Sequence, residues 1–423
     1  MKRIAMLLLI VVAAVGAFAQ NAPTSTEVKL SPAERNITQA RRLIEKNPKD
    51  FEAFNALALA LSRRARETSD VAFYAQAEEA LKNSFAMSPD NFDGARIHAW
   101  LLLGKHEFAS ALEEATRLNK KMPDDVMVYG FLTDANVELG NYKAAEAAAQ
   151  RMLDLRPGNL AALTRAAYLR ELFGDVDGAL ELMNMAFQST PPREVEDGAW
   201  ILTQMAHLKL SVGKADEAEA LLTQALAMFP DYHYAMGNLA KVRIEQRRYD
   251  DAVELLKKRY LTAPHAENLF DLAEALKLSG REQEASRAFS EFEKKSLLES
   301  DRADNSNHEL IFYYADYARQ PGKALEVATS EFARRHDVFT LDSYAWALYV
   351  NGQYAAARKQ IEAALEAGIR DAKLLRHAGE IALKNGDRTA AEHYLRQSAE
   401  LNGVGSEQAR NSLKILVSNT AGK

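Results

Sequence analysis

The chain has 423 residues, of which 53 are Lys or Arg and 59 are Asp or Glu, so its formal net charge is −6 at pH 7. This mild acidity disfavours nucleic acid and anionic lipid as main partners. The sequence holds no cysteine, which excludes disulfides, thiol catalysis and cysteine-ligated metals, while its 48% hydrophobic residues are ample for a large core.

Residues 1–19 have the pattern of a signal peptide. Lys2 and Arg3 precede the apolar run 4–15, and Ala17-Phe18-Ala19 has the small-x-small form that signal peptidase cuts. We expect a mature chain that begins at Gln20 with a net charge of −8. The apolar run is too short to span a membrane, so no stable anchor is expected after cleavage. Export without cysteine favours a bacterial periplasm, with full secretion as the alternative.

One stretch, residues 126–157, shows how the rest of the chain is built. Its apolar residues fall at helical spacing on both sides of a tight turn at Gly140-Asn141, and Pro157 ends the second helix. A single helical hairpin of this size cannot bury its own apolar face, so it needs copies on both sides.

The copies are marked by an alanine five residues after each turn. This position holds a small side chain because two helices cross closely there. The steps between these alanines are 34, 34, 34, 39, 34, 33, 39, 33 and 34 residues. Six of the turns carry glycine, and prolines follow the first six alanines by twelve residues. The alanines are Ala77, Ala111, Ala145, Ala179, Ala218, Ala252, Ala285, Ala324, Ala357 and Ala391.

The turns at 140–145 and 352–357, read with this period, resemble the tetratricopeptide repeat (TPR) family. The resemblance covers roughly residues 31–403. It implies an all-α fold: a superhelix (solenoid) of about ten TPR-like helical hairpins with terminal capping helices and no β-strands. Arg247 departs from the family by taking the glycine place of one turn.

The breaks in the period predict the organisation of the chain. A signal peptide at 1–19 and a disordered linker at 20–30 precede an N-terminal array at 31–293. A hinge or long loop at 294–308 then leads to C-terminal repeats at 309–403 and to a capping helix and tail at 404–423. Extra residues at 62–70 are expected to lengthen a loop, and those near 191–195 to lengthen a turn between repeats.

No chemistry-bearing motif stands out. The nine histidines form no His-x3-His pair, and there is no nucleophile elbow or phosphate-binding glycine loop. Acidic pairs such as Asp124-Asp125 stand at helix starts, where the helix dipole accounts for them. We therefore expect no enzyme activity, no cofactor and no metal site.

What remains is a surface. In the TPR family the first helix of each repeat lines the concave groove. The resemblance therefore implies that the outward residues of these helices face a partner, and large aromatic groups there are typical anchors for a peptide or helix. These residues are Arg96, Trp100, Tyr168, Trp200, His207, Tyr234, Lys241, Phe270, Trp346 and Tyr349.

The sequence thus predicts a non-catalytic scaffold of the bacterial envelope that binds a peptide or helix of an unidentified protein partner. A small-ligand or glycan-binding protein, or an accessory enzyme subunit, is the alternative, because aromatic rings also stack on sugars. A purely architectural spacer is a third reading. In that case the aromatic residues would only pack between repeats or against the next turn of the superhelix.

Overall fold

The computed structural model describes residues 30–68, 70–299, 305, 307–401 and 405–421. The predicted signal peptide, and the predicted linker up to residue 29, lie outside these ranges. Within the described residues the regular secondary structure is entirely helical, which confirms the all-α prediction.

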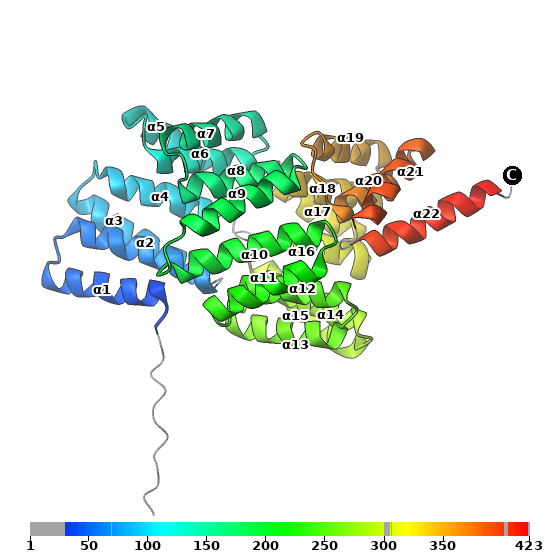
Figure 1. Ribbon diagram of the computed structural model, residues 1–423, viewed down its shortest axis with the longest axis horizontal. Coiled ribbons are helices and arrows are strands. Elements are labelled where there is room, and N and C mark those ends of the chain that lie inside the picture. Colours follow the sequence, from blue (N-terminus) through cyan, green and yellow to red (C-terminus); the bar gives the residue numbers. More distant parts are fainter. Residues whose placement is uncertain (1–29, 69, 300–304, 306, 402–404, 422–423) are drawn as a thin grey trace, which may run out of the picture.

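A first helix, ten helical hairpins and a last helix follow one another along the described chain (Figure 1). The flanking helices are α1 (Pro32–Lys46) and α22 (Ser406–Ala421). The hairpins are α2 (Phe51–Thr68) with α3 (Ala72–Met87), α4 (Phe92–Gly104) with α5 (Phe108–Lys121), α6 (Val126–Glu138) with α7 (Tyr142–Leu155), α8 (Leu160–Leu172) with α9 (Val176–Ser189), α10 (Val195–Ser211) with α11 (Ala215–Met228), α12 (His233–Glu245) with α13 (Tyr249–Thr262), α14 (Ala266–Leu278) with α15 (Glu282–Glu299), α16 (Asn307–Phe312) and the π-helix η1 (Tyr313–Tyr317) with α17 (Pro321–Phe332), α18 (Val338–Val350) with α19 (Tyr354–Leu365), and α20 (Ala372–Lys384) with α21 (Arg388–Glu400).

The repeat marks have the structural roles that the spacing predicts. The ten register alanines are all buried, from Ala77 to Ala391, at the crossing of the two helices of each hairpin. The six turn glycines adopt positive φ, and Arg247 does so in the turn that lacks glycine. Positive φ costs a residue with a Cβ some strain, which explains why glycine is used at most of these turns.

The first helices of the hairpins form the inner layer of the array. Successive first helices, such as α4 and α6 or α18 and α20, contact one another much more closely than successive second helices do. A curved array brings its elements closer on the concave side. The first helices therefore line the concave face, which we call the inner face.

Two insertions that break the period lengthen helices instead of loops. The extra residues at 62–68 continue α2 to Thr68, so the predicted longer loop there is wrong. Those before the fifth hairpin add a turn to the start of α10, which begins at Val195. In both places the added residues have helical neighbours to pack on, and continuing the helix satisfies their backbone groups.

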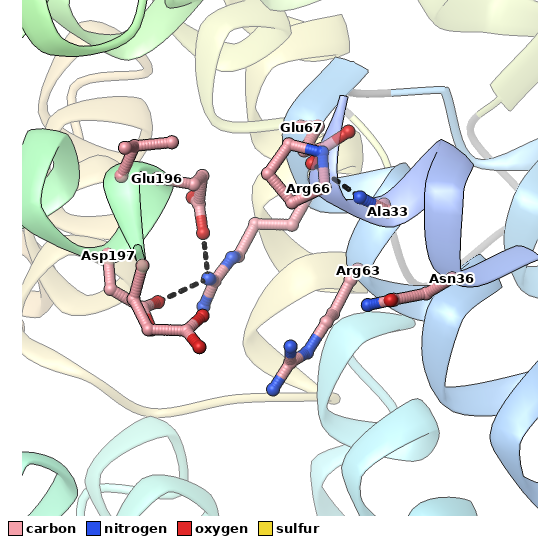
Figure 2. A pocket seen from close by; sticks show the side chains of 10 residues that line it. Ala33, Asn36, Arg63, Arg66, Glu67, Glu196 and Asp197 are labelled. Carbon is pink, nitrogen blue, oxygen red and sulfur yellow. Dashed lines mark hydrogen bonds and ion pairs between the residues drawn. The ribbon is translucent and has the colours of Figure 1, made fainter. Parts of the chain in front are cut away.

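The two lengthened helices meet. Arg66 near the end of α2 contacts Glu196 and Asp197 in the added turn of α10, with 2.9 Å between Arg66 Nη2 and Asp197 Oδ1 (Figure 2). Tyr232 donates to Glu196 at 2.8 Å, and His233 Nε2 lies 3.2 Å from the Arg66 carbonyl oxygen. We call this contact between the first hairpin and the fifth and sixth the first seam.

A second seam joins the third and fourth hairpins to the ninth and tenth. The His336 amide donates to the Glu138 carbonyl oxygen at 2.9 Å, and the Val338 amide donates to the Tyr142 hydroxyl at 2.9 Å. Arg335 lies 3.6 Å from the Glu138 carboxylate. Beside these contacts, a buried apolar cluster combines residues of α6–α8 with residues of α18–α20. Successive turns of the superhelix therefore touch each other at both seams.

The segment predicted as a hinge or loop is helical over its first six residues, because α15 runs to Glu299. Residues 300–304 and 306 lie outside the described ranges. At the C-terminal end, Leu416 of α22 is buried in a cluster with Ala391 and Leu395 of α21, as a capping helix requires.

Candidate partner-binding surface

The four N-terminal members of the predicted surface are partly exposed on first helices. Arg96 of α4 is held by Asp93 and by Asp125, each at 2.8 Å, so its guanidinium bridges α4 and the start of α6. Trp100 packs with one side on the core of the second and third hairpins. Tyr168 of α8 packs on the cluster of the second seam, and Trp200 of α10 packs between the fourth and fifth hairpins.

The next members continue this surface onto α12. His207 Nε2 lies 2.8 Å from Glu171, which links α10 to α8. The ring of Tyr234 lies 3.9 Å from that of His233, and Tyr234 keeps partial exposure. Lys241 is exposed and has no ion pair to the described residues. From α4 to α12 the inner face therefore combines partly exposed aromatic rings with charged groups.

Phe270 does not face outward as predicted. It is 4% exposed and its ring centroid lies 5.1 Å from that of Phe292 and 5.9 Å from that of Phe289. Tyr317 of η1 closes the remaining side at 6.0 Å. Helical spacing predicts that Phe270 lies on the inner side of α14, but its ring packs into the core of its own hairpin, on α15, with η1 beside it.

Trp346 is also buried, at 6% exposure, so its predicted outward orientation is wrong too. Its ring stacks on Tyr349 at 4.7 Å and on His377 of α20 at 4.1 Å, and its Nε1 donates to Asp316 at 2.9 Å. His377 in turn stacks on Phe312 at 5.9 Å. These four rings, which we call the ring column, run through the eighth, ninth and tenth hairpins. Tyr349, at one end of it, is half-buried.

Two cations and a carboxyl complete the ring column. Lys373 Nζ lies 3.2 Å from the Phe312 ring centroid, and the Arg376 guanidinium lies 5.0 Å from that of Trp346. His377 bonds Asp342 through Nδ1 and Arg376 through Nε2, each at 2.7 Å. A neutral imidazole fits both contacts, because Nδ1 donates while Nε2 accepts. Burial lowers the pKa of His377 well below its usual value, in agreement with a neutral ring.

Several carboxyl groups facing this region were not singled out from the sequence. Burial raises the pKa of Asp342 to about 7, against Lys373 and Arg376. Burial, helped by Glu267 and Asp271, raises the pKa of Glu309 to about 8. Burial also raises the pKa of Glu274, which accepts from the Tyr317 hydroxyl at 2.7 Å. The only sequence signal for these carboxyl groups was their position, two to nine residues from the start of a first helix.

Other kinds of site find little support in the described part of the chain. There, no three His, Asp or Glu side chains converge in a way that would hold a metal ion. None of the helices described is both long and apolar enough to cross a bilayer.

The hairpin geometry agrees with the family matches. A tetratricopeptide repeat family model matches residues 209–265, and a second one matches residues 96–159, 132–194 and 345–404. Together the matches span just over half of the chain. The chain belongs to the tetratricopeptide repeat family. This membership makes it a helical repeat scaffold of the kind used for protein–protein interaction, a fold that is generally non-catalytic.

Several solved structures are similar to this chain at low sequence identity and with TM-scores below 0.5. The human IFIT1 dimer with m7Gppp-AAAA is 14% identical with a TM-score of 0.49, over 89% of this chain and 91% of that one. Yeast Tom70 is 13% identical with a TM-score of 0.41, over 91% and 92%. PilW, a type IV pilus biogenesis factor, is 15% identical with a TM-score of 0.41, over 48% and 93%. Such scores describe a general likeness of helical arrays and nothing about ligands. No curated protein matches the chain.

Proposed function

We propose that this TPR chain is a non-catalytic scaffold that binds a peptide or helix of a partner protein on its inner face, between α4 and α12. One observation carries the proposal. Trp100, Tyr168, Trp200 and Tyr234 come from four hairpins and all keep partial exposure on first helices. Partly exposed rings in a row are suitable anchors, since they bury a large area at low entropic cost.

Charged groups beside these rings would give the surface specificity. Arg96 is bridged to two carboxylates, His207 to Glu171, and Lys241 is free to pair with an acidic group. Rim charges of this kind steer and select a partner more than they add affinity. An aromatic centre with a mixed-charge rim favours an amphipathic segment of a protein.

The cellular place of this scaffold is proposed from the N-terminal sequence pattern alone. We infer that the chain is exported and acts in a bacterial envelope, with the periplasm as the main site. N-terminal sequencing of the mature protein from fractionated cells tests this. A chain that begins at Gln20 in the periplasmic fraction supports export, and a chain that retains residues 1–19 in the cytoplasm contradicts it.

Affinity capture tests the binding proposal. The tagged mature chain is used on its native envelope fraction at low and high salt, with mass spectrometry of what is retained. We expect a stoichiometric partner that survives high salt, and expect Trp100→Ala with Tyr234→Ala to release it. Met122→Ala with Met185→Ala is the control, because these exposed residues belong to second-helix surfaces.

Two outcomes would contradict the scaffold. Equal capture by both double variants would mean that the partner binds outside the inner face. Capture of no partner at all would favour the alternatives. A small molecule or glycan retained through purification would then indicate a ligand-binding protein, and no saturable binding of either kind would indicate a spacer.

A further inference from the structure

The second seam, like the first, differs from the contacts between neighbouring hairpins. In a solenoid each hairpin depends on its immediate neighbours. The second seam instead joins residues about two hundred positions apart, through a few hydrogen bonds and one apolar edge. Breaking it would unpair no helix of any hairpin. The seam is therefore a separable contact.

The turn glycines show how close the approach is. A Cβ on Gly140 would lie 2.7 Å from the His336 carbonyl oxygen, and one on Gly174 would lie 2.5 Å from the Gly368 carbonyl oxygen. Backbone atoms are the obstacle, so no side chain can move aside. At the same turn position, Gly280, Gly352 and Gly386 have nothing within 4 Å.

The seam also holds a poorly satisfied charge. Oε2 of Glu138 is buried and accepts no hydrogen bond from the described residues, although Arg335 lies 3.6 Å away. Burial raises the pKa of Glu138 to about 7; Arg335 opposes this, while Asp337, Asp134 and Glu331 add to it. A buried carboxyl with an unsatisfied oxygen weakens an interface. The seam is thus a weaker contact than the hairpin cores.

The seam borders the proposed binding surface, to which Tyr168 belongs. Tyr168 and Tyr142 pack on the shared cluster, in which Leu169 and Leu172 of α8 belong with Val338 and Leu341 of α18. The amide of His336, just before α18, donates to the Glu138 carbonyl, and the amide of Val338, the first residue of α18, donates to the Tyr142 hydroxyl. One helix start with apolar residues and a preceding basic residue therefore fits this edge of the inner face.

We propose that the second seam is an autoinhibitory contact, in which the start of α18 occupies a docking site for a partner helix of the same chemistry. Such a partner begins with an apolar helical turn whose first amide donates to the Tyr142 hydroxyl, and it carries a basic residue just before that turn. The inference rests on the proposed scaffold function and names one occupant for one part of its inner face. Arg335, Val338 and Leu341 of the chain itself show the chemistry that the partner helix would have.

Opening of the seam is tested first, by hydrogen exchange at the amides of His336 and Val338. Gly140→Ala is compared with Gly352→Ala, because both glycines have φ +74° but only Gly140 meets a backbone atom across the seam. We expect exchange at both amides to rise about tenfold or more in Gly140→Ala only. Equal exchange in the two variants would overturn the proposal.

A gentler pair covers the case in which Gly140→Ala does not fold. Tyr142→Phe removes the hydroxyl that accepts from Val338. Tyr354→Phe is its control, since Tyr354 follows Gly352 as Tyr142 follows Gly140 and its hydroxyl has no hydrogen bond to the described residues. Faster exchange at Val338 in Tyr142→Phe alone supports a separable seam, and unchanged exchange contradicts it.

Autoinhibition is tested with a labelled peptide of residues 334–350 as the probe, added to the full chain. Arg335→Glu places a second carboxylate near Glu138, and the repulsion between the two favours the open seam. The substituted residue precedes α18, so the docking site on α6–α8 is unchanged. Arg358→Glu is the control, because it reverses the charge of an exposed arginine of α19 whose ion pairs are with Glu362 and Asp387.

We expect the peptide to bind the Arg335→Glu chain several-fold more tightly than the natural chain, and the Arg358→Glu chain with the affinity of the natural chain. Equal affinity in all three would overturn the autoinhibitory role. That result would leave the scaffold proposal standing if capture through Trp100 and Tyr234 still succeeds. Failure of that capture, with the peptide still binding the Arg335→Glu chain more tightly, would contradict the scaffold proposal and leave the autoinhibitory contact standing.

Discussion

Trp346 and Phe270 show what a helical position can and cannot say about a single residue. The period predicts that both lie on the inner side of a first helix, but both are buried. Phe270 packs on Phe289 and Phe292 of α15, in its own hairpin, and on Tyr317 of η1 in the next. Trp346 is covered by His377 of the next hairpin and by Tyr349 of its own helix. A spacing rule within one repeat contains no information about the rings that the next hairpin contributes.

The ring column leads to the first prediction. Trp346→Ala should lower the free energy of unfolding of the last three hairpins by about 3 kcal/mol or more, because it removes a buried ring that two others stack on. Hydrogen exchange of α18 and α20 measures this. Trp100→Ala, at a partly exposed ring, is the control and should cost clearly less. Similar losses in both variants would show that the column adds little.

Glu309 leads to a pH prediction. A folded-state pKa raised to about 8 means that the protonated form is the one stabilised by folding. Its contribution is complete below the ordinary pKa near 4.5 and is lost progressively as the pH rises to about 8, because burial and the repulsion from Glu267 and Asp271 are offset only in part by Lys373. The loss between pH 6 and 9 should be on the order of 2 kcal/mol.

Thermal melting followed by circular dichroism checks this sign. The Tm of the natural chain should fall from pH 6 to pH 9, and Glu309→Gln should reduce that fall, since the amide cannot ionise. Glu291→Gln, on the exposed side of α15, is a suitable control because its carboxyl is exposed and accepts from the Tyr260 hydroxyl at 3.1 Å. A fall of equal size in Glu309→Gln would assign the pH dependence to other groups.

At the scale of the helix, the sequence predicted the regular elements well. The positions of alanine, glycine and proline define the hairpins because each residue type has a local cause. Alanine allows two helices to cross closely, glycine adopts positive φ in the turn, and proline lacks the amide that a continuing helix needs. The insertions were harder. Residues 62–68 look like polar loop residues when α2 is considered alone, and continue the helix because Arg64 pairs with Glu34 of α1 and Arg66 with α10.

Those two insertions form one structural unit, which gives the third prediction. Arg66→Ala should destabilise the chain by about 1–3 kcal/mol, because Glu196 is left beside Tyr232 with its charge unpaired. Arg63→Ala is a matched control: it lies one turn earlier on α2, lines the same pocket and has no ion pair to the described residues (Figure 2). Urea unfolding measures both. A comparable effect of Arg63→Ala would argue against a specific seam.

At the scale of the whole molecule, the repeat pattern predicted a solenoid but could not predict how tightly it coils. The rise and rotation per hairpin depend on small packing differences, and over ten hairpins these decide whether successive turns meet. The seam partners, Arg66 with Asp197 and His336 with Glu138, are more than a hundred residues apart. A contact at such separation carries no periodic signal in one sequence.

Small-angle scattering tests the closed coil. Arg66→Ala combined with Arg335→Ala should increase the maximum dimension and the radius of gyration, while far-ultraviolet circular dichroism stays unchanged because no hairpin is lost. Each single variant should give a smaller increase. An unchanged scattering curve with the double variant would mean that hairpin packing alone sets the curvature. A loss of helical signal would mean that the seams support the hairpins themselves.

The seams also decide how the molecule would respond to tension. An open solenoid behaves as a spring, because small rotations at many hairpin interfaces add up to a large extension at low force. Fastening one turn to the next removes that compliance, since a pull on the ends loads the Arg66–Asp197 and His336–Glu138 contacts before any hairpin moves. The chain should therefore be stiff at low load, and should lengthen abruptly once a seam gives way.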